Sequence, residues 1–297
     1  MLRAGPAPID GGLASELQAR GMDLSGRLWS AGLLIEDPAQ IQAVHASYVA
    51  AGARVLISAS YQCSHHALAL AGRDPAEADA LLRRSVELAR AATLAAGRPE
   101  VLVAASVGPY GAALADGSEY RGRYGLRHQE LVAFHAQRLA VLAEASPDLF
   151  AVETIPDALE AGAIAEALAG HPQIPAWISF SCADAATTCG GDTFSDAVMV
   201  AASAGSVVAV GVNCTPPEHV HGLLQRAADV TDLPLVVYPN AGRTWDPGTR
   251  AWSGVGADTV PTDAVLDWVD AGASLIGGCC GLGPAAVAGI AAVLATG

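Results

Sequence analysis

Three of the six cysteines have positions that could hold a metal ion. Cys214 follows an apolar run that ends at Val212, and Cys279 and Cys280 follow another that ends at Ile276. Zinc in proteins takes four tetrahedral nitrogen or sulfur ligands, and a site with three protein ligands leaves the fourth position for water or a substrate. The sequence therefore predicts one catalytic Zn2+ ion per chain, held by Cys214, Cys279 and Cys280.

Packing is the alternative explanation for these thiols, because a buried free cysteine often acts as a small hydrophobic side chain. The glycines of Gly277-Gly278-Cys279-Cys280-Gly281 favour the metal, since glycine lets the backbone turn tightly and approach a ligand. Cys182 and Cys189 lack the spacing of a zinc knuckle, and we expect ordinary thiols there. Cys63 lies just beyond an apolar run, where we favour a structural role.

Two acidic residues also stand at the ends of apolar runs. Asp10 lies in Ile9-Asp10-Gly11-Gly12, and Glu153 lies in Val152-Glu153-Thr154-Ile155-Pro156. A carboxylate in such a place costs free energy to remove from water unless it has a partner. A salt bridge to Arg or a helix cap is one solution for either acid alone. Together, beside the cysteines, the two acids favour a ligand that carries an α-ammonium group.

The elements that must position these residues are short apolar runs rich in β-branched side chains. Each run is typical of a buried parallel strand, and helical patterns lie between the runs. The runs cover residues 8–10, 55–58, 101–105, 149–153, 176–180, 207–212, 235–238 and 274–276. Eight strands that alternate with helices are typical of an α/β (β/α)8 TIM barrel, with an open doubly wound sheet as the structural alternative.

Local signals support this alternation. Asp37-Pro38 and Asp74-Pro75 each predict a helix start, with proline at the first helical position. The tripeptide Ala-Gly-Ala at residues 51–53 and 271–273 closes a helix before a strand, as a C-terminal glycine cap does. The carboxyl ends of the strands form the functional face of such a barrel, so the cysteines and the acids should meet there.

Composition limits the class of protein. The 297 residues are 52% hydrophobic, and no linker divides residues 1–297, so we expect a single domain. Lys plus Arg total 16 against 30 Asp plus Glu, with no basic run, so we expect neither nucleic acid nor a membrane surface as partner. No run has the length of a signal peptide or a membrane span, which predicts a cytoplasmic protein. The sequence carries no signal for an oligomeric state.

In their order along the chain, these motifs resemble the homocysteine S-methyltransferases that use S-methylmethionine or S-adenosylmethionine. The resemblance runs almost from end to end. It rests on Asp10-Gly11-Gly12, Leu28-Trp29-Ser30-Ala31, Ser58-Ala59-Ser60-Tyr61-Gln62, Ser106-Val107-Gly108-Pro109-Tyr110-Gly111, Asp116-Gly117-Ser118-Glu119-Tyr120-Arg121-Gly122, Glu153-Thr154-Ile155-Pro156, Gly211-Val212-Asn213-Cys214-Thr215-Pro216-Pro217, Val237-Tyr238-Pro239-Asn240 and the segment from Gly277 to Gly281.

The resemblance implies a zinc-bearing homocysteine-binding barrel that transfers a methyl group from a sulfonium donor to the thiol of L-homocysteine, giving methionine. The three cysteines named above match the zinc ligands, and Asp10 and Glu153 match contacts of the homocysteine amino group. The substrate contacts that we expect are completed by Gly11, Gln62, Asn213 and Tyr238. Relatives that use betaine carry a tyrosine where this chain has Gln62, so betaine is not the expected donor.

Contacts to the donor are a separate question. Trp29, Tyr61 and Tyr110 are candidates, because aromatic ring faces attract cations, with core packing as the alternative for each. The connection over residues 108–127 has no clear periodicity and contains Glu119 and Tyr120. For this connection a lid or donor-binding role and a solvated loop stay open as two interpretations.

Two other function classes use a similar zinc site. A zinc-dependent barrel hydrolase or aldolase would activate water or a carbonyl group, but such sites favour His and carboxylate ligands. A non-enzymatic zinc store or thiol sensor would need the three cysteines but would not need Asp10 and Glu153 at the same barrel mouth. The thiol methyltransferase is the interpretation that uses all five residues.

Overall fold

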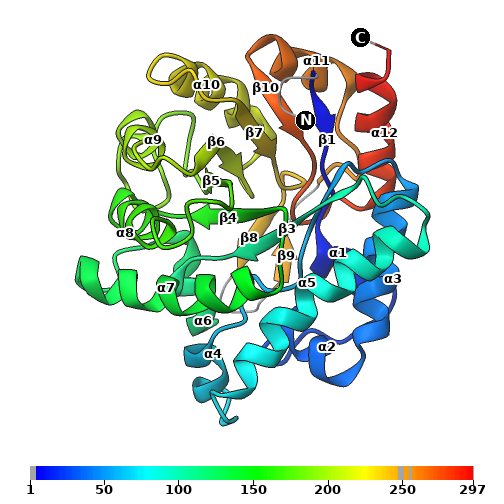
Figure 1. The fold of residues 1–297 in the computed structure, drawn as a ribbon. Coiled ribbons are helices and arrows are strands. Elements are labelled where there is room, and N and C mark those ends of the chain that lie inside the picture. Colours follow the sequence, from blue (N-terminus) through cyan, green and yellow to red (C-terminus); the bar gives the residue numbers. More distant parts are fainter. Residues whose placement is uncertain (1–4, 247–250, 254–255, 297) are drawn as a thin grey trace.

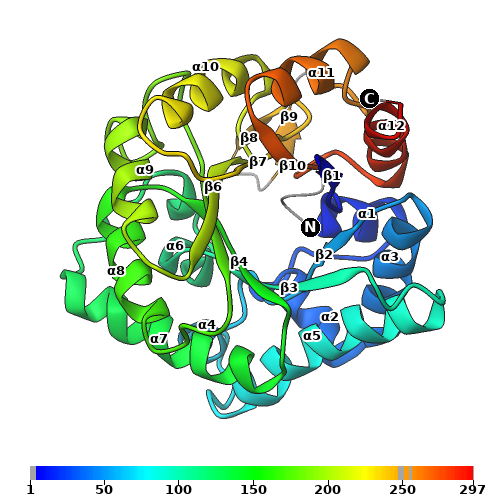
Figure 2. The same cartoon turned by 45° about the horizontal axis from the view of Figure 1, so that its top comes forward.

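The computed structural model describes residues 5–246, 251–253 and 256–296, and eight parallel strands in them form a barrel. Figures 1 and 2 show these strands at the centre, with helices around the outside. The order in the sheet is β1-β10-β7-β6-β5-β4-β3-β2, and each neighbouring pair is parallel. The predicted (β/α)8 barrel is therefore confirmed, and the open doubly wound sheet is not formed.

The barrel strands are short. They are β1 (Ala7–Pro8), β2 (Val55–Ile57), β3 (Leu102–Val107), β4 (Leu149–Ile155), β5 (Ala176–Phe180), β6 (Val207–Asn213), β7 (Leu235–Tyr238) and β10 (Ala273–Ile276). Each of the eight apolar runs in the sequence contains or overlaps one of these strands, with ends that differ by at most two residues. The apolar runs locate the strands because each strand is buried along most of its length.

Helices follow the strands around the barrel. They are α1 (Leu13–Ala19), α2 (Ser30–Glu36), α3 (Pro38–Ala50), α4 (His65–Leu70), α5 (Glu77–Ala95), α6 (Tyr110–Leu114), the short 3-10 helix η1 (Ser118–Tyr120), α7 (His128–Glu144), α8 (Ala158–Leu168), α9 (Phe194–Ala202), α10 (Pro217–Ala228), α11 (Thr262–Asp270) and α12 (Pro284–Leu294). The predicted start at Asp37-Pro38 is confirmed, and Gly52 and Gly272 close α3 and α11 with a φ of 99° each.

Three local features differ from the sequence prediction. α5 begins at Glu77 instead of Pro75, because Asp74 first closes a turn by accepting a hydrogen bond from Ala76 N. The connection over residues 108–127 contains α6 and η1, which are too short to show periodicity. An antiparallel pair, β8 (Thr244–Asp246) and β9 (Ala251–Ser253), lies between β7 and α11.

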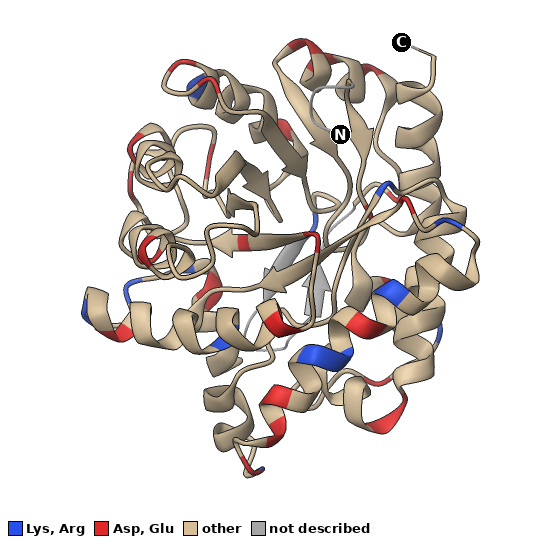
Figure 3. Cartoon of the chain, viewed as in Figure 1, with Lys and Arg blue, Asp and Glu red and all other residues tan. Residues whose placement is uncertain are grey.

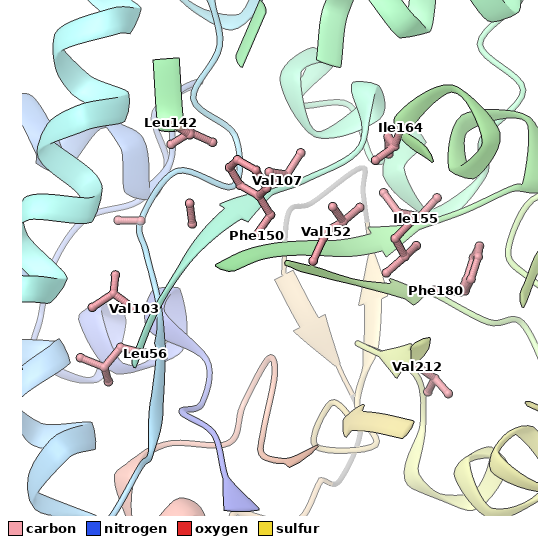
Figure 4. Close-up of a cluster of buried hydrophobic side chains, with 14 of the residues drawn as sticks. Leu56, Val103, Val107, Leu142, Phe150, Val152, Ile155, Ile164, Phe180 and Val212 are labelled. Atoms are coloured by element: carbon pink, nitrogen blue, oxygen red, sulfur yellow. The ribbon is translucent and has the colours of Figure 1, made fainter. Parts of the chain in front are cut away.

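Apolar side chains pack on both sides of the barrel sheet. Figure 4 shows part of the outer layer, where Phe150 of β4 belongs to one cluster with Leu142 of α7 and Ile164 of α8. A second cluster, which includes Ala151, fills the barrel interior. Successive side chains of a strand point to opposite faces. Glu153 therefore shares the inward row with Ala151 and lies nearer to the carboxyl end of β4.

The contact between β1 and β2 closes the barrel. Ile9 and Val55 form a parallel bridge, Asp10 N donates to Val55 O, and Arg54 N donates to Pro8 O. The carboxylate of Asp10 adds a further bond across this seam by accepting from Ile57 N at 2.7 Å. One residue at the carboxyl end of β1 thus joins two strands through both its backbone and its side chain.

The charged side chains lie mainly on the outer elements. Figure 3 shows acidic and basic residues interspersed along helices such as α5 and α7, and no basic stripe is visible in this view. In the described residues, no helix combines the length and the apolar character needed to cross a membrane.

Candidate functional site

Three cysteine sulfurs meet at the carboxyl end of the barrel. Cys214 follows β6, and Cys279 and Cys280 follow β10, with β7 between the two strands. The three Sγ atoms lie within 4.8 Å of one another, with 3.5 Å between Cys214 and Cys280 and 3.9 Å between Cys279 and Cys280. Tetrahedral zinc with sulfur ligands at about 2.3 Å needs sulfurs roughly 3.8 Å apart. The side chains present therefore fit such an ion.

The three thiols lie close enough together for each to influence the pKa of the others. Hydrogen bonding with Cys279 and Cys280, and also with Tyr120, holds the pKa of Cys214 well below its usual value. Hydrogen bonding to Cys214 in turn raises the pKa of Cys279 and of Cys280 well above the usual value. A bound cation would favour the deprotonated form of all three thiols.

Tyr120 contacts this group, although the sequence names it only within the connection for which a lid or donor-binding role stays open. Its hydroxyl oxygen lies 3.2 Å from Cys214 Sγ. Burial raises the pKa of Tyr120 well above its usual value, so the phenol stays protonated and can donate to the thiolate. The one sequence signal for it is the motif over residues 116–122, which alone does not tell which side chain points inward.

Asp10 and Glu153 are both buried at the same end of the barrel. Burial raises the pKa of Asp10 well above its usual value and the pKa of Glu153 to about 7. Asp10 Oδ1 is buried without a hydrogen-bond partner, and Glu153 accepts from Ser106 Oγ. No ion pair in the described part of the chain involves either acid. The two carboxylates thus retain the capacity to bind a cationic ligand.

Asn213 supports the site from the end of β6. Its Oδ1 accepts from Thr154 N at 2.7 Å and from Ser179 Oγ at 2.8 Å, and its Nδ2 donates to Thr154 Oγ1 at 2.8 Å. Thr154 has a φ of 61° and Cys214 a φ of 47°, and both values are unusual for residues other than glycine. Asn213 therefore holds a strained segment directly beside Glu153, as is common at functional sites.

A cavity of about 440 Å³ opens above the cysteines. Most of the residues expected at the site line it: Gly11, Trp29, Tyr61, Gln62, Glu153, Cys214, Tyr238, Cys279 and Cys280. Tyr238 is fixed by bonds of its hydroxyl to Trp177 Nε1 at 3.0 Å and Ser179 Oγ at 2.7 Å. Gln62 Oε1 is buried without a partner in the described residues and can accept from a ligand.

The structure places Tyr110 away from this cavity. Its ring stacks on His66 with 5.3 Å between centroids, and it meets the edge of Phe134 at 5.0 Å. Its hydroxyl oxygen lies 3.2 Å from His66 Nε2. Tyr110 is thus part of an aromatic cluster between α4, α6 and α7.

The remaining cysteines lie outside the metal-binding group. Cys63 is fully buried in the outer apolar cluster, and burial raises its pKa to about 12. Cys182 and Cys189 lie in the connection after β5, and burial raises the pKa of both. Among the described residues, the group of close-lying sulfurs contains Cys214, Cys279 and Cys280 and none of the remaining three cysteines.

Comparison with known proteins gives one consistent family. A family model described as homocysteine S-methyltransferase matches residues 9–294. Homocysteine S-methyltransferase 4 of Zea mays is 47% identical over 303 residues, which cover 97% of this chain and 89% of the maize protein. Selenocysteine Se-methyltransferase of Brassica oleracea var. italica is 44% identical over 306 residues, which cover 96% of this chain and 88% of that protein.

A solved structure agrees with this relationship. The metallated form of a homocysteine methyltransferase from Escherichia coli matches with a TM-score of 0.87 and 42% sequence identity. The match covers 97% of this chain and 96% of the bacterial protein. The whole barrel is therefore shared, including the strand ends that carry the cysteines and the acids.

Proposed function

The chain belongs to the homocysteine S-methyltransferase family, and we propose that it transfers a methyl group from a sulfonium donor to L-homocysteine at a zinc site formed by Cys214, Cys279 and Cys280. S-Methylmethionine and S-adenosylmethionine are the donors that we propose, and methionine is the product. The observation that carries this proposal is the group of three cysteine sulfurs within 4.8 Å at the floor of the cavity.

The three cysteines would supply three of four tetrahedral ligands and leave the fourth position open toward the cavity. Zinc bound there would deprotonate the thiol of homocysteine and present its sulfur as a nucleophile at neutral pH. Three thiolate ligands, as opposed to neutral histidines, keep electron density on the substrate sulfur. This ligand set also argues against the hydrolase or aldolase alternative, since such sites favour His and carboxylate ligands.

Asp10 and Glu153 would bind the α-ammonium group of homocysteine. The free Oδ1 of Asp10 and the buried carboxylate of Glu153 both lack a cationic partner in the described residues. An ammonium group would offset the cost of burying these charges and fix the amino acid relative to the cysteines. A zinc store has no use for such a pair, which is the reason to prefer the enzyme.

Trp29 and Tyr61 are the proposed aromatic contacts of the donor. Both line the cavity with the cysteines, whereas Tyr110 packs elsewhere. Ring faces stabilise a nearby cation and exclude water from it. Because the sulfonium charge disappears on transfer, the walls need to orient the donor more than to supply an acid.

A methyl-transfer assay with several donors tests the proposal. We expect transfer from S-methylmethionine or S-adenosylmethionine to homocysteine, loss of transfer after chelation and recovery after zinc is restored. Selenohomocysteine should be included as a second acceptor. The Cys279→Ser variant should lose both zinc and activity, whereas the control Cys63→Ala, which removes a buried thiol elsewhere, should keep both. Full activity of the completely metal-free protein would overturn the zinc mechanism.

A second variant separates an enzyme from a zinc store. Glu153→Gln should retain bound zinc but require much more homocysteine, because the ammonium contact is weakened. Unchanged kinetics for homocysteine in this variant would contradict the assigned role of Glu153.

A further inference from the structure

We infer that Glu119 places its carboxylate against the positively charged sulfur of the methyl donor, an inference that rests on the proposed function. Glu119 lies in η1 and lines the same cavity as the cysteines. Its Oε2 atom is buried and has no hydrogen-bond partner in the part of the chain that the structure describes. A buried carboxylate oxygen without a partner costs free energy, and a cationic ligand would offset that cost.

Arg121 places a positive charge near this carboxylate but forms no ion pair with it in the described residues. None of the ion pairs among the described residues includes Glu119. Arg27 also lines the cavity, but its Nη1 donates to Leu114 O at 3.0 Å. Burial is the largest influence on Glu119 and raises its pKa to about 7, with Asp116 and Cys214 adding negative charge nearby. The position is therefore suited to a ligand that carries a positive charge.

The packing of η1 fixes this arrangement. A side chain on Gly111 of α6 would come within 2.4 Å of Glu119 N, so only glycine lets α6 and η1 approach this closely. The next residue, Tyr120, is held by its contact with Cys214. The backbone on both sides of Glu119 is thereby anchored, and its side chain lines the cavity with Oε2 unpaired in the described residues.

The charges of the two substrates indicate which group meets Glu119. The α-ammonium of homocysteine is matched by Asp10 and Glu153. Of the other two acids that line the cavity, Asp23 is exposed to solvent, which leaves Glu119 as the one with a buried, unmatched oxygen in the described residues. Glu119, Cys214 and Tyr61 line the same cavity, so the acid shares this space with the three thiols and the aromatic wall. The reacting methyl group must reach a sulfur bound beside Cys214, and the sulfonium sulfur is one bond away from that methyl carbon.

The charge changes during the reaction give Glu119 a defined role. The thiolate sulfur of homocysteine forms a bond to the methyl carbon while the bond between that carbon and the donor sulfur breaks. The electron pair of the broken bond stays on the donor sulfur, which becomes a neutral thioether. Glu119 thus attracts the donor before transfer and loses its partner afterwards, so it favours donor binding and product release. It is not required for the chemical step itself.

Glu119→Gln tests this assignment, because it removes the charge and keeps the shape. We expect the KM for S-methylmethionine to rise about tenfold or more, while the KM for homocysteine and kcat change by less than about twofold. Zinc content and thermal stability should match the wild type. Glu119→Asp keeps the charge and should recover part of the donor affinity. Glu87→Gln is the matched control, since it makes the same change at an exposed position of α5 away from the cavity and should leave the donor KM unchanged.

Equilibrium binding identifies the group that Glu119 recognises. Dimethylsulfoniopropionate has a sulfonium but no amino group, and 3-(methylthio)propionate is its neutral thioether. Glu119→Gln should weaken binding of the sulfonium compound and leave binding of the thioether unchanged. Weaker binding of S-methylmethionine alone would assign Glu119 to the amino group and overturn the inference, as would wild-type donor affinity in the variant. These outcomes require an active wild-type enzyme, whereas failure of the proposed function would appear as an inactive wild type.

Discussion

The hydroxyl group of Tyr120 lies 3.2 Å from the sulfur of Cys214, although 94 residues separate them in the chain. The contact joins the connection after β3 to the end of β6. It is the one hydrogen bond in the described residues that a side chain other than cysteine makes to a sulfur of the metal-binding group. Groups that bond to a metal ligand orient that ligand and tune its charge.

Replacing Tyr120 by phenylalanine should therefore weaken zinc binding. Loss of such an outer contact typically costs about 10- to 100-fold in metal affinity or activity, and we expect the lower end because the cysteines remain. Competition with a chromogenic chelator measures the affinity, and the absorption of the cobalt-substituted protein reports on the thiolate ligands.

Tyr124→Phe provides the control for this substitution. Tyr124 lies in the same connection, but its hydroxyl donates to Glu160 Oε2 at 3.1 Å and does not contact a cysteine. Its variant should bind zinc as the wild type does. Equal zinc affinity in Tyr120→Phe and wild type would show that the contact has no influence on the metal.

Asn213→Ala should destabilise the fold by about 3 kcal/mol, because it leaves buried partners such as Thr154 N without hydrogen bonds. Denaturant unfolding of the metal-free protein measures this loss. Ser179→Ala removes one of the bonds to Asn213 and the bond to Tyr238 Oη, but Thr154 N keeps its partner, so it should cost less, roughly 1–2 kcal/mol. If both variants unfolded at the wild-type denaturant concentration, Asn213 would not be the support that its contacts indicate.

The strand ends could be predicted from sequence, whereas the direction of side chains in the connection after β3 could not. Cys214 and Glu153 end apolar runs, and the barrel geometry alone brings such positions to one face. The placements of Glu119 and Tyr110 depend on α6 and η1, which are single turns without periodicity. Tyr110 packs on His66 and Glu119 faces the cavity because Gly111 allows the two turns to approach. That approach is a tertiary contact, which no pattern of residue types specifies.

Glu160 should make stability depend on pH. It is fully buried, accepts from Tyr110 N and Tyr124 Oη, and burial raises its pKa to about 7 from an unfolded value near 4.5. A carboxyl group whose pKa is higher in the folded than in the unfolded protein contributes stability that is fully present below the unfolded pKa. This contribution is lost as the pH rises through the folded pKa. From pH 5 to pH 8, the free energy of unfolding of Glu160→Gln should therefore rise by on the order of 2 kcal/mol relative to that of the wild type.

Unfolding at several pH values checks this prediction. Glu166→Gln, an exposed position on the same helix, should keep the wild-type dependence because its carboxylate is not buried. A parallel pH dependence in wild type and Glu160→Gln would mean that Glu160 does not titrate in this range.

Two glycines should respond in opposite directions to alanine. A Cβ on Gly211 of β6 would lie 1.8 Å from Val236 O, which is backbone of the adjacent strand. Gly211→Ala should therefore cost more than about 3 kcal/mol or prevent folding. Gly289 in α12 has no atom within 4 Å of such a Cβ. Gly289→Ala should stabilise the protein by about 0.5–1 kcal/mol. Thermal unfolding distinguishes the two variants. Equal effects on the unfolding temperature would contradict the close approach between residue 211 and the backbone of Val236.

The seam at Asp10 connects ligand binding to the integrity of the barrel. The same residue pairs with Val55 through its backbone and accepts from Ile57 N through Oδ2, while its carbonyl accepts from Gly278 beside the cysteine pair. Its Oδ1 is buried without a partner in the described residues, next to Gly11, which lines the cavity. A ligand that binds Asp10 therefore contacts the residue that joins β1 to β2 and closes the barrel. Bound homocysteine should therefore stabilise this junction. Protection of the amide hydrogens at residues 55–57 from solvent exchange then reports whether homocysteine is bound.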